Sequence, residues 1–226
     1  GHDRTGDNLA VYSDGHSFCF RCSFTTGRKS TSISRNANTP HSKNVSNWSN
    51  TIPHVVFDYL RSFDLSLEEI LKNRIQWDEA RKLLIFPVYG PNGNLVFYQG
   101  RYFGEDKDHP KYITHGSVVG TYDIHWCSDS LIPDSVVVVE DFISSIIVSR
   151  VTTTMPLFSS NLNLTQLNRL STMFSKLIWW LDPDKQKDYP KMINKSFLFF
   201  DSVHCIYRDK DPKYYSTEEV KCELLV

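Results

Sequence analysis

The chain has 226 residues, which is enough for one large domain or two small ones with a sizeable core. Its composition, 40% hydrophobic and 23% charged, is typical of a soluble globular protein, and its net charge of −1 excludes a global polyelectrolyte field. The apolar runs are too short for a transmembrane helix and no signal peptide is visible, so we expect a cytoplasmic protein without a membrane partner. Five cysteines with a single C-x-x-C pair do not fit a secreted disulfide framework.

Charge is unevenly distributed along the chain. No Asp or Glu occurs between residues 15 and 57, although this stretch contains five basic residues: Arg21, Arg28, Lys29, Arg35 and Lys43. A basic N-terminal part followed by an acidic remainder fits phosphate contacts at one end and metal ligands at the other. A solvated linker that lacks acidic residues is an equally good interpretation.

Residues 1–26 are predicted to form a hairpin that leads into a metal-binding turn. Short strand patterns flank a turn at residues 13–15, and the second of them runs into Cys19 and Cys22. A structural zinc ion needs four ligands, so these two cysteines supply half of a site. His2 is either a third ligand or an exposed terminal residue. Residues 27–50, rich in Ser, Asn and Thr, are predicted to be a linker.

Residues 51–130 are predicted to form a small α+β subdomain. Apolar residues at helical spacing after Pro53 indicate two short helices, and Ser66 with Glu69 forms a capping box at the start of the second. The stretch LLIFPVYGPNGNLVFYQGRYF predicts a hairpin in which residues 83–89 pair with residues 95–103. Residues 104–125 are expected to be a polar loop.

Residues 131–226 are predicted to alternate between strands and helices. Strands are expected at 136–140, 153–158, 176–181 and 203–207, with helical or mixed segments at 141–151, 161–174 and 185–198. Asn161 is a candidate N-cap, and Trp179 and Trp180 are expected in the core. This alternation indicates an α/β fold with a mainly parallel sheet covered by helices on both faces.

Acidic residues follow three of the predicted strands. Glu140 and Asp141 follow the run VVVV, Asp182 and Asp184 flank Pro183 after KLIWWL, and Asp211 lies in the later turn RDKDPK. Acids that begin a helix are one explanation, because the helix dipole favours negative charge there. A ligand site is the other, because ligands of open α/β sheets bind beyond the carboxyl ends of the strands. Three such strand ends favour the site.

The spacing of the two aspartates suggests a divalent cation. Alternation along extended backbone places side chains two residues apart on the same side, and Pro183 keeps Asp182 extended. Two adjacent carboxylates repel each other unless a cation lies between them. Mg²⁺ is often held by one or two carboxylates together with waters and substrate phosphates. The sequence therefore predicts a magnesium site at Asp182 and Asp184.

The ordered set of motifs resembles the TOPRIM-type primases of the phage primase-helicase family, a branch of the DnaG-like superfamily. The acidic strand ends resemble the TOPRIM pattern, DNLAVYSDGHSFCFRC resembles the second half of the family's zinc ribbon, and FPVYGPNGNLVFYQGRYF followed by PKYIT resembles the segment before TOPRIM. Together these segments cover nearly the whole chain. The sequence departs from the family pattern in having Glu140-Asp141 instead of Glu-Gly, Lys185-Gln186-Lys187 instead of a Gly-rich helix start, and no first C-x-x-C. It also lacks the phosphate loop of a helicase domain.

The resemblance implies a DNA primase that synthesises short RNA primers from NTPs on single-stranded DNA. Glu140, Asp182 and Asp184 would be catalytic and would bind Mg²⁺ or Mn²⁺ with Asp211 as an outer ligand, and Asp141 is a weaker candidate. Arg101, Lys111 and Lys210 would contact nucleotide or template. Zinc in the full-length protein, a replicative helicase as domain or partner, and a host-cell cytoplasm are also implied. A TOPRIM nuclease and a non-enzymatic DNA-binding replication module are the alternatives.

Overall fold

A computed structural model describes residues 9–11, 17–19, 25–26, 48–90, 93–116, 124–159 and 161–225. The first strands, β1 (Leu9–Val11), β2 (Ser17–Cys19) and β3 (Thr25–Thr26), form an antiparallel sheet, which confirms the predicted N-terminal hairpin. The predicted zinc half-site lies outside the part of the chain whose side chains are described, because His2 and Cys22 are not covered and only the backbone of Cys19 is.

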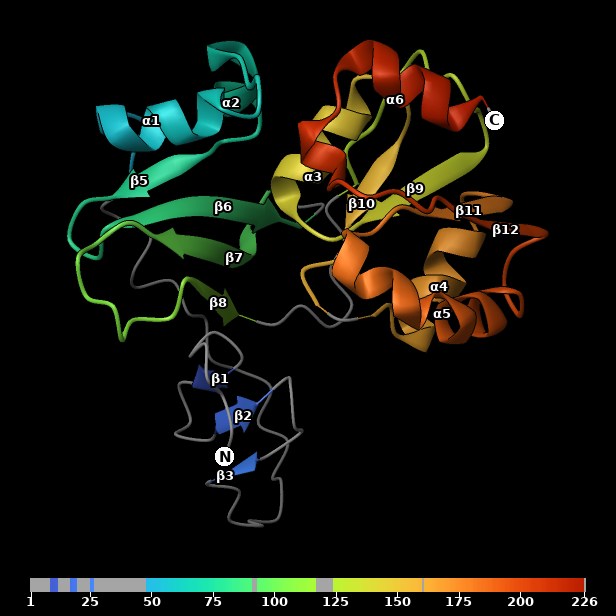
Figure 1. Ribbon diagram of the computed structural model, residues 1–226, viewed down its shortest axis with the longest axis horizontal. Helices are drawn as coiled ribbons and strands as arrows, with labels where there is room; N and C mark the ends of the chain where they lie inside the picture. The colour runs from blue at the N-terminus through green and yellow to red at the C-terminus, as the bar shows by residue number, and fades with distance from the viewer. Residues whose placement is uncertain are drawn as a thin grey trace.

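The N-terminal subdomain combines two short helices with an antiparallel sheet of five strands (Figure 1). The helices are α1 (His54–Arg61) and α2 (Leu67–Lys72), and the predicted capping box of Ser66 and Glu69 is confirmed. The sheet has the order β4-β5-β6-β7-β8, with β4 (Trp48–Ser49), β5 (Gln76–Asp78), β6 (Leu83–Tyr89), β7 (Leu95–Tyr102) and β8 (Tyr112–Gly116). Strands β6 and β7 are the predicted hairpin.

Two of these strands differ from the expectation. Strand β4 lies in the stretch predicted to be a linker, where Trp48 packs edge-on against Tyr98 at a ring distance of 4.9 Å. Strand β8 lies in the predicted polar loop, where it pairs with β7 and continues the sheet. Both are sheet edges, and their strand conformation depends on pairing with a neighbouring strand rather than on a pattern of their own.

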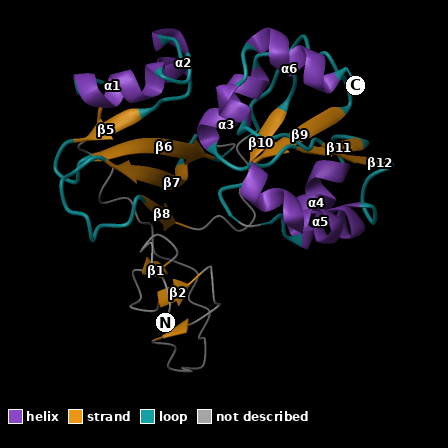
Figure 2. Ribbon diagram, viewed as in Figure 1, coloured by secondary structure: helices purple, strands orange, loops and turns teal. Residues whose placement is uncertain are grey.

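The C-terminal part contains the predicted parallel sheet, in the order β10-β9-β11-β12. Its strands are β9 (Ser135–Val139), β10 (Thr154–Pro156), β11 (Lys176–Trp179) and β12 (Ser202–Cys205). Helices α3 (Phe142–Ser149) and α6 (Thr217–Leu224) cover one face, and α4 (Leu164–Ser171) and α5 (Tyr189–Ser196) cover the other, as Figure 2 shows. The N-cap of α4 is Asn163 and not the predicted Asn161, because the side chain of Asn163 accepts the bond from the Gln166 amide.

The four consecutive valines of β9 supply both faces of this sheet. Val137 and Val139 pack with α3 and α6, whereas Val136 and Val138 pack with α4 and α5. All four side chains are fully buried, as expected for a central strand of a parallel sheet whose successive side chains point to opposite faces. No helix of the described residues is long and apolar enough to cross a membrane.

The two subdomains share one hydrophobic core. Phe86 of β6 lies 5.4 Å from Phe142 of α3, measured between ring centroids. At the edge of this core the Arg150 guanidinium donates from Nε and Nη2 to the two carboxylate oxygens of Glu69, at 2.7 and 2.9 Å, and from Nη2 to the Asp64 carbonyl at 2.7 Å. The ion pair is largely buried, since the Arg150 side chain is 18% exposed.

Replacing Arg150 by Met is expected to lower the free energy of unfolding by about 2 kcal/mol, because charge-assisted hydrogen bonds of this kind each contribute on that order. The melting temperature should fall by about 4–8 °C for a chain of this size. Arg61→Met, on the exposed side of α1, is the matched control and should change the melting temperature little. Equal losses in the two variants, measured by thermal unfolding, would contradict a stabilising role of the Arg150 pair.

Candidate active site at the carboxyl edge of the parallel sheet

Glu140 and Asp182 lie at the same edge of the parallel sheet. They follow β9 and β11, which are adjacent, parallel and aligned so that Trp179 faces Val138. The Trp180 amide donates to the Val138 carbonyl at 2.9 Å, which continues the alignment toward both acids. The carboxyl ends of these two central strands therefore present their acidic residues together, as predicted from the sequence.

Lys213 joins three acidic residues around one ammonium group. The 3-10 helix η2 (Pro212–Tyr214), which follows β12, carries Lys213 to this edge. Its Nζ lies 2.7 Å from Asp211 Oδ2, 2.9 Å from Asp141 Oδ2 and 3.4 Å from Asp182 Oδ2. Despite burial, these carboxylates raise the pKa of Lys213, so the group is charged at neutral pH. Sequence reasoning missed this residue; the only signal was its place two residues after Asp211.

Asp141 has two roles. It is the N-cap of α3, where its Oδ1 accepts from the Ser144 amide at 2.9 Å and its Oδ2 from the Ser144 hydroxyl at 3.0 Å. The same carboxylate contacts Lys213. The interpretation of the acids as helix starts is therefore correct for Asp141, which also belongs to the acidic cluster.

Glu140 and Asp182 are held in an environment that disfavours their charged forms. Burial is the main cause of the raised pKa of Glu140, about 7, with Lys185 opposing it and Asp184 and Asp141 adding to it. Burial also raises the pKa of Asp182 to about 8, against the lowering effect of Lys213. Glu140 Oε2 and Asp182 Oδ1 are buried without a hydrogen-bond partner among the described residues.

Asp184 lies at the rim of this cluster. It is in the first turn of the 3-10 helix η1 (Pro183–Asp188), its side chain is 72% exposed, and its Oδ2 lies 3.5 Å from Lys185 Nζ. The negative charge of Asp184 raises the pKa of Glu140. The structure therefore brings the three acids of the sequence prediction to one edge, where Glu140 and Asp182 are partly buried and Asp184 is exposed to solvent.

The donor set fits a hard divalent cation. Carboxylate oxygens are the ligands that Mg²⁺ prefers, and Glu140 Oε2 and Asp182 Oδ1 have no hydrogen-bond partner in the described part of the chain. Among the described residues no three His, Cys, Asp or Glu side chains are arranged as a complete ligand set. The ammonium of Lys213 lies against one carboxylate oxygen from each of three aspartates.

Comparisons with known proteins identify the fold. No protein-family model matches the chain, and a search of curated proteins finds no match. Solved structures do match: the zinc-binding and RNA polymerase domains of the Aquifex aeolicus primase at 17% identity and a TM-score of 0.61, over 78% of this chain and 56% of that one. A DnaG primase catalytic domain bound to single-stranded DNA matches at 14% identity and a TM-score of 0.62, over 78% and 73% of the two chains.

The primase fragment of the bacteriophage T7 primase-helicase matches over a longer range, 97% of this chain and 92% of that one, at 17% identity and a TM-score of 0.50. The chain has the fold of a DnaG-type primase core. This confirms the predicted mixture of a parallel sheet and an antiparallel subdomain. The chain spans 56% of the length of the Aquifex primase structure.

In this primase-core fold, Arg101 of β7 lies between the aromatic rings of Tyr59 in α1 and Tyr112 in β8, which we call the aromatic cage. Its guanidinium is 4.2 Å from the centre of the Tyr59 ring, and its Nη1 donates to the Tyr112 hydroxyl at 2.5 Å. Burial is the main cause of the raised pKa of Tyr59, and the charge of Asp141 adds to it. Lys111 is close to the cage, with its Nζ 5.9 Å from the centre of the Tyr112 ring.

The structure places Lys210 apart from the carboxylates that Lys213 contacts. Its Nζ lies 3.1 Å from Glu219 Oε1, in the capping box of α6, and 4.0 Å from the centre of the Tyr215 ring. Two lysines of the turn RDKDPK thus have different surroundings, and the one at the acidic cluster is Lys213.

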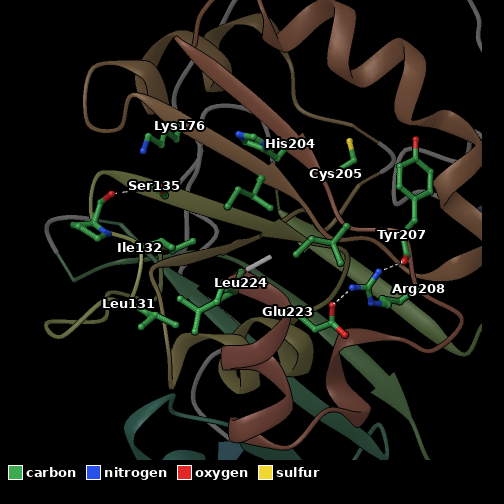
Figure 3. Close-up of a pocket in the computed structure, with 14 residues that line it drawn as sticks. Leu131, Ile132, Ser135, Lys176, His204, Cys205, Tyr207, Arg208, Glu223 and Leu224 are labelled. Atoms are coloured by element: carbon green, nitrogen blue, oxygen red, sulfur yellow. Dashed lines mark hydrogen bonds and ion pairs between the residues drawn. The ribbon is translucent and has the colours of Figure 1, made fainter.

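A separate cavity of about 650 Å³ lies beside β12 and the end of α6 (Figure 3). Ser135 and Lys176, which begin β9 and β11, line it, whereas the acidic cluster follows the ends of these strands. Its one carboxylate, Glu223, is already paired with Arg208. The cavity therefore takes no part in the acidic site.

The raised pKa of Asp182 predicts a pH-dependent effect of Asp182→Asn on stability. A carboxyl whose pKa is higher in the folded than in the unfolded state stabilises the fold below its unfolded pKa and loses that contribution as pH rises through about 8. Asn cannot ionise, so the variant should melt about 2–4 °C higher than the natural chain at pH 8.5 in EDTA, a gain of ~1 kcal/mol. The two melting temperatures should converge below about pH 4, where the carboxyl is protonated in both the folded and the unfolded state. A difference that does not change between pH 5 and 8.5 would contradict the assigned burial of charge.

Proposed function

We propose that the chain is the catalytic part of a DNA primase that joins NTPs into short RNA primers on a single-stranded DNA template. The observation that carries the proposal is the meeting of Glu140 and Asp182 at the carboxyl edge of the parallel sheet. Each has a buried oxygen without a hydrogen-bond partner among the residues that the structure describes. The primase-core fold supports it, because solved structures with this fold are DNA primases.

In this proposal Asp182 and Asp184 hold Mg²⁺ or Mn²⁺, with Asp211 as an outer ligand. The metal supplies charge neutralisation for the triphosphate and for the oxygens that attack and leave during nucleotidyl transfer. Glu140 completes the site or accepts the proton of the 3′-hydroxyl. Burial raises the pKa of Glu140 in the metal-free chain, and a nearby cation would favour the charged form that accepts a proton.

Arg101 and Lys111 are the proposed contacts to triphosphate or template. The Tyr59 ring and the Tyr112 hydroxyl fix the Arg101 guanidinium, which lowers the entropy lost when it binds a phosphate. Its Nε is buried and has no partner among the described residues. Lys210 would first have to leave Glu219 to take the same role.

The phage primase-helicase subtype belongs to the same proposal. It includes a replicative helicase as partner or as a further domain, and zinc bound by Cys19 and Cys22 together with ligands from the full-length protein. The long overlap with the T7 primase fragment supports this subtype. A completed ribbon would contact the template bases at the initiation site.

The decisive experiment incubates the chain with labelled NTPs, Mg²⁺ and single-stranded DNA and separates the products by size. We expect template-dependent oligoribonucleotides. Shortened DNA without RNA product would instead support the TOPRIM nuclease, and binding of DNA without either product would support the non-enzymatic module. Asp201→Asn, an exposed aspartate before β12, is the matched control and should retain the activity.

A further inference from the structure

Within the part of the chain that the structure describes, the acidic cluster divides into oxygens that Lys213 contacts and oxygens without a hydrogen-bond partner. The ammonium has three donor hydrogens, and one carboxylate oxygen from each of Asp141, Asp182 and Asp211 lies within 3.4 Å of it. Among the described residues, the two oxygens without a hydrogen-bond partner are Glu140 Oε2 and Asp182 Oδ1. Asp182 therefore contributes one oxygen to each group.

Lys213 is fixed in this position by its own surroundings. Its side chain is 15% exposed, and it extends from η2, which Pro212 begins with a buried ring. The neighbouring Tyr214 packs against Phe63 of the other subdomain at a ring distance of 5.4 Å. The ammonium is therefore held by the fold on both sides of its residue and is not a mobile surface charge.

A bound cation and this ammonium would compete for the same carboxylates. Catalytic sites with two metal ions place the ions ~3.5–4 Å apart, with carboxylates shared between them. An ammonium within 2.7 to 3.4 Å of three carboxylates already occupies one such position electrostatically. A second divalent ion there would meet a fixed positive charge at close range, which weakens its binding by about 100-fold or more.

We propose that Lys213 takes the place of one of the two metal ions, so that the protein binds a single divalent cation at Asp182, Asp184 and Glu140. This inference rests on the metal site of the proposed function and adds the number of its ions and the residue that sets it. Lys213 is then a specificity-determining residue of the site: it keeps one cation position permanently filled by the chain itself.

The test counts Mn²⁺ ions bound to the whole chain, by titration followed by electron paramagnetic resonance. The natural chain should bind one ion, with the spectrum of an isolated Mn²⁺. Lys213→Met removes the charge and keeps an unbranched side chain that is one atom shorter. This variant should bind two ions that are spin-coupled through their short separation. Lys210→Met, in the same turn but paired with Glu219, is the matched control and should bind one ion.

The outcomes separate this inference from the proposed function. Two coupled ions in the natural chain, or one ion in a folded Lys213→Met variant, would overturn the role of Lys213 while leaving the metal site in place. No bound ion in the natural chain would remove the metal site and the inference together. If Lys213→Met does not fold, anomalous scattering from Mn²⁺ in crystals of the natural chain decides: one peak beside Glu140 and Asp182 supports the proposal, and two peaks reject it.

Discussion

Asp182→Asn is expected to reduce primer synthesis by about 100- to 1000-fold, the size of effect seen when one charge-stabilising group is removed from an active site. Asp182 has one carboxylate oxygen that contacts Lys213 and one that has no hydrogen-bond partner among the described residues. Its loss therefore affects both groups of oxygens in the cluster. Asp184→Asn should also abolish most of the activity. The measurement is the initial rate of RNA product formation on single-stranded DNA at saturating NTP.

Both variants should stay folded and should still bind single-stranded DNA. Replacing Asp182 removes a charge that burial disfavours, so the metal-free protein should not lose stability. The expected template contacts are basic groups and not the acids. Full primer synthesis by either variant at limiting Mg²⁺ would refute the assignment, and an unfolded variant would show that the aspartate is structural.

The central strands were predictable from the sequence because the hydrophobicity of their own residues indicates that both faces are buried. Four valines in succession indicate a strand buried on two faces, and Val136–Val139 indeed divide between the two cores. An acid directly after such a strand must lie at the carboxyl edge of the sheet. The convergence of Glu140 and Asp182 follows from the parallel pairing of β9 and β11, which the alternation of strands and helices already indicated.

Lys213 could not be predicted in this way. The turn RDKDPK offers two lysines three residues apart, and only the folded turn decides which one points at the carboxylates. The 3-10 helix that begins at Pro212 directs Lys213 to Asp141 and Asp182, whereas Lys210 reaches Glu219 in α6. The same limit applies to the edge strands β4 and β8, since each forms a strand through its pairing with β5 or β7 and not through a pattern of its own.

Lys213→Met is expected to be the most destabilising of these substitutions in the absence of metal, by about 3–5 kcal/mol, the cost of removing one partner from a buried ion pair. Asp141, Asp182 and Asp211 would then face each other without a counter-ion. The melting temperature in EDTA should fall by about 6–20 °C for a chain of this size. Lys210→Met is the control and should lose far less, because Glu219 is exposed to solvent and screened.

Divalent cations should restore much of the stability that Lys213→Met loses. They should not do so for an ordinary core variant. Removing the ammonium leaves a second set of carboxylate oxygens for a metal ion, and a ligand that binds only the folded state stabilises it in proportion to the logarithm of its concentration. The melting temperature of Lys213→Met should therefore rise more steeply with Mg²⁺ concentration than that of the natural chain. Equal slopes would mean that Lys213 stabilises the fold without controlling the access of cations to the acidic cluster.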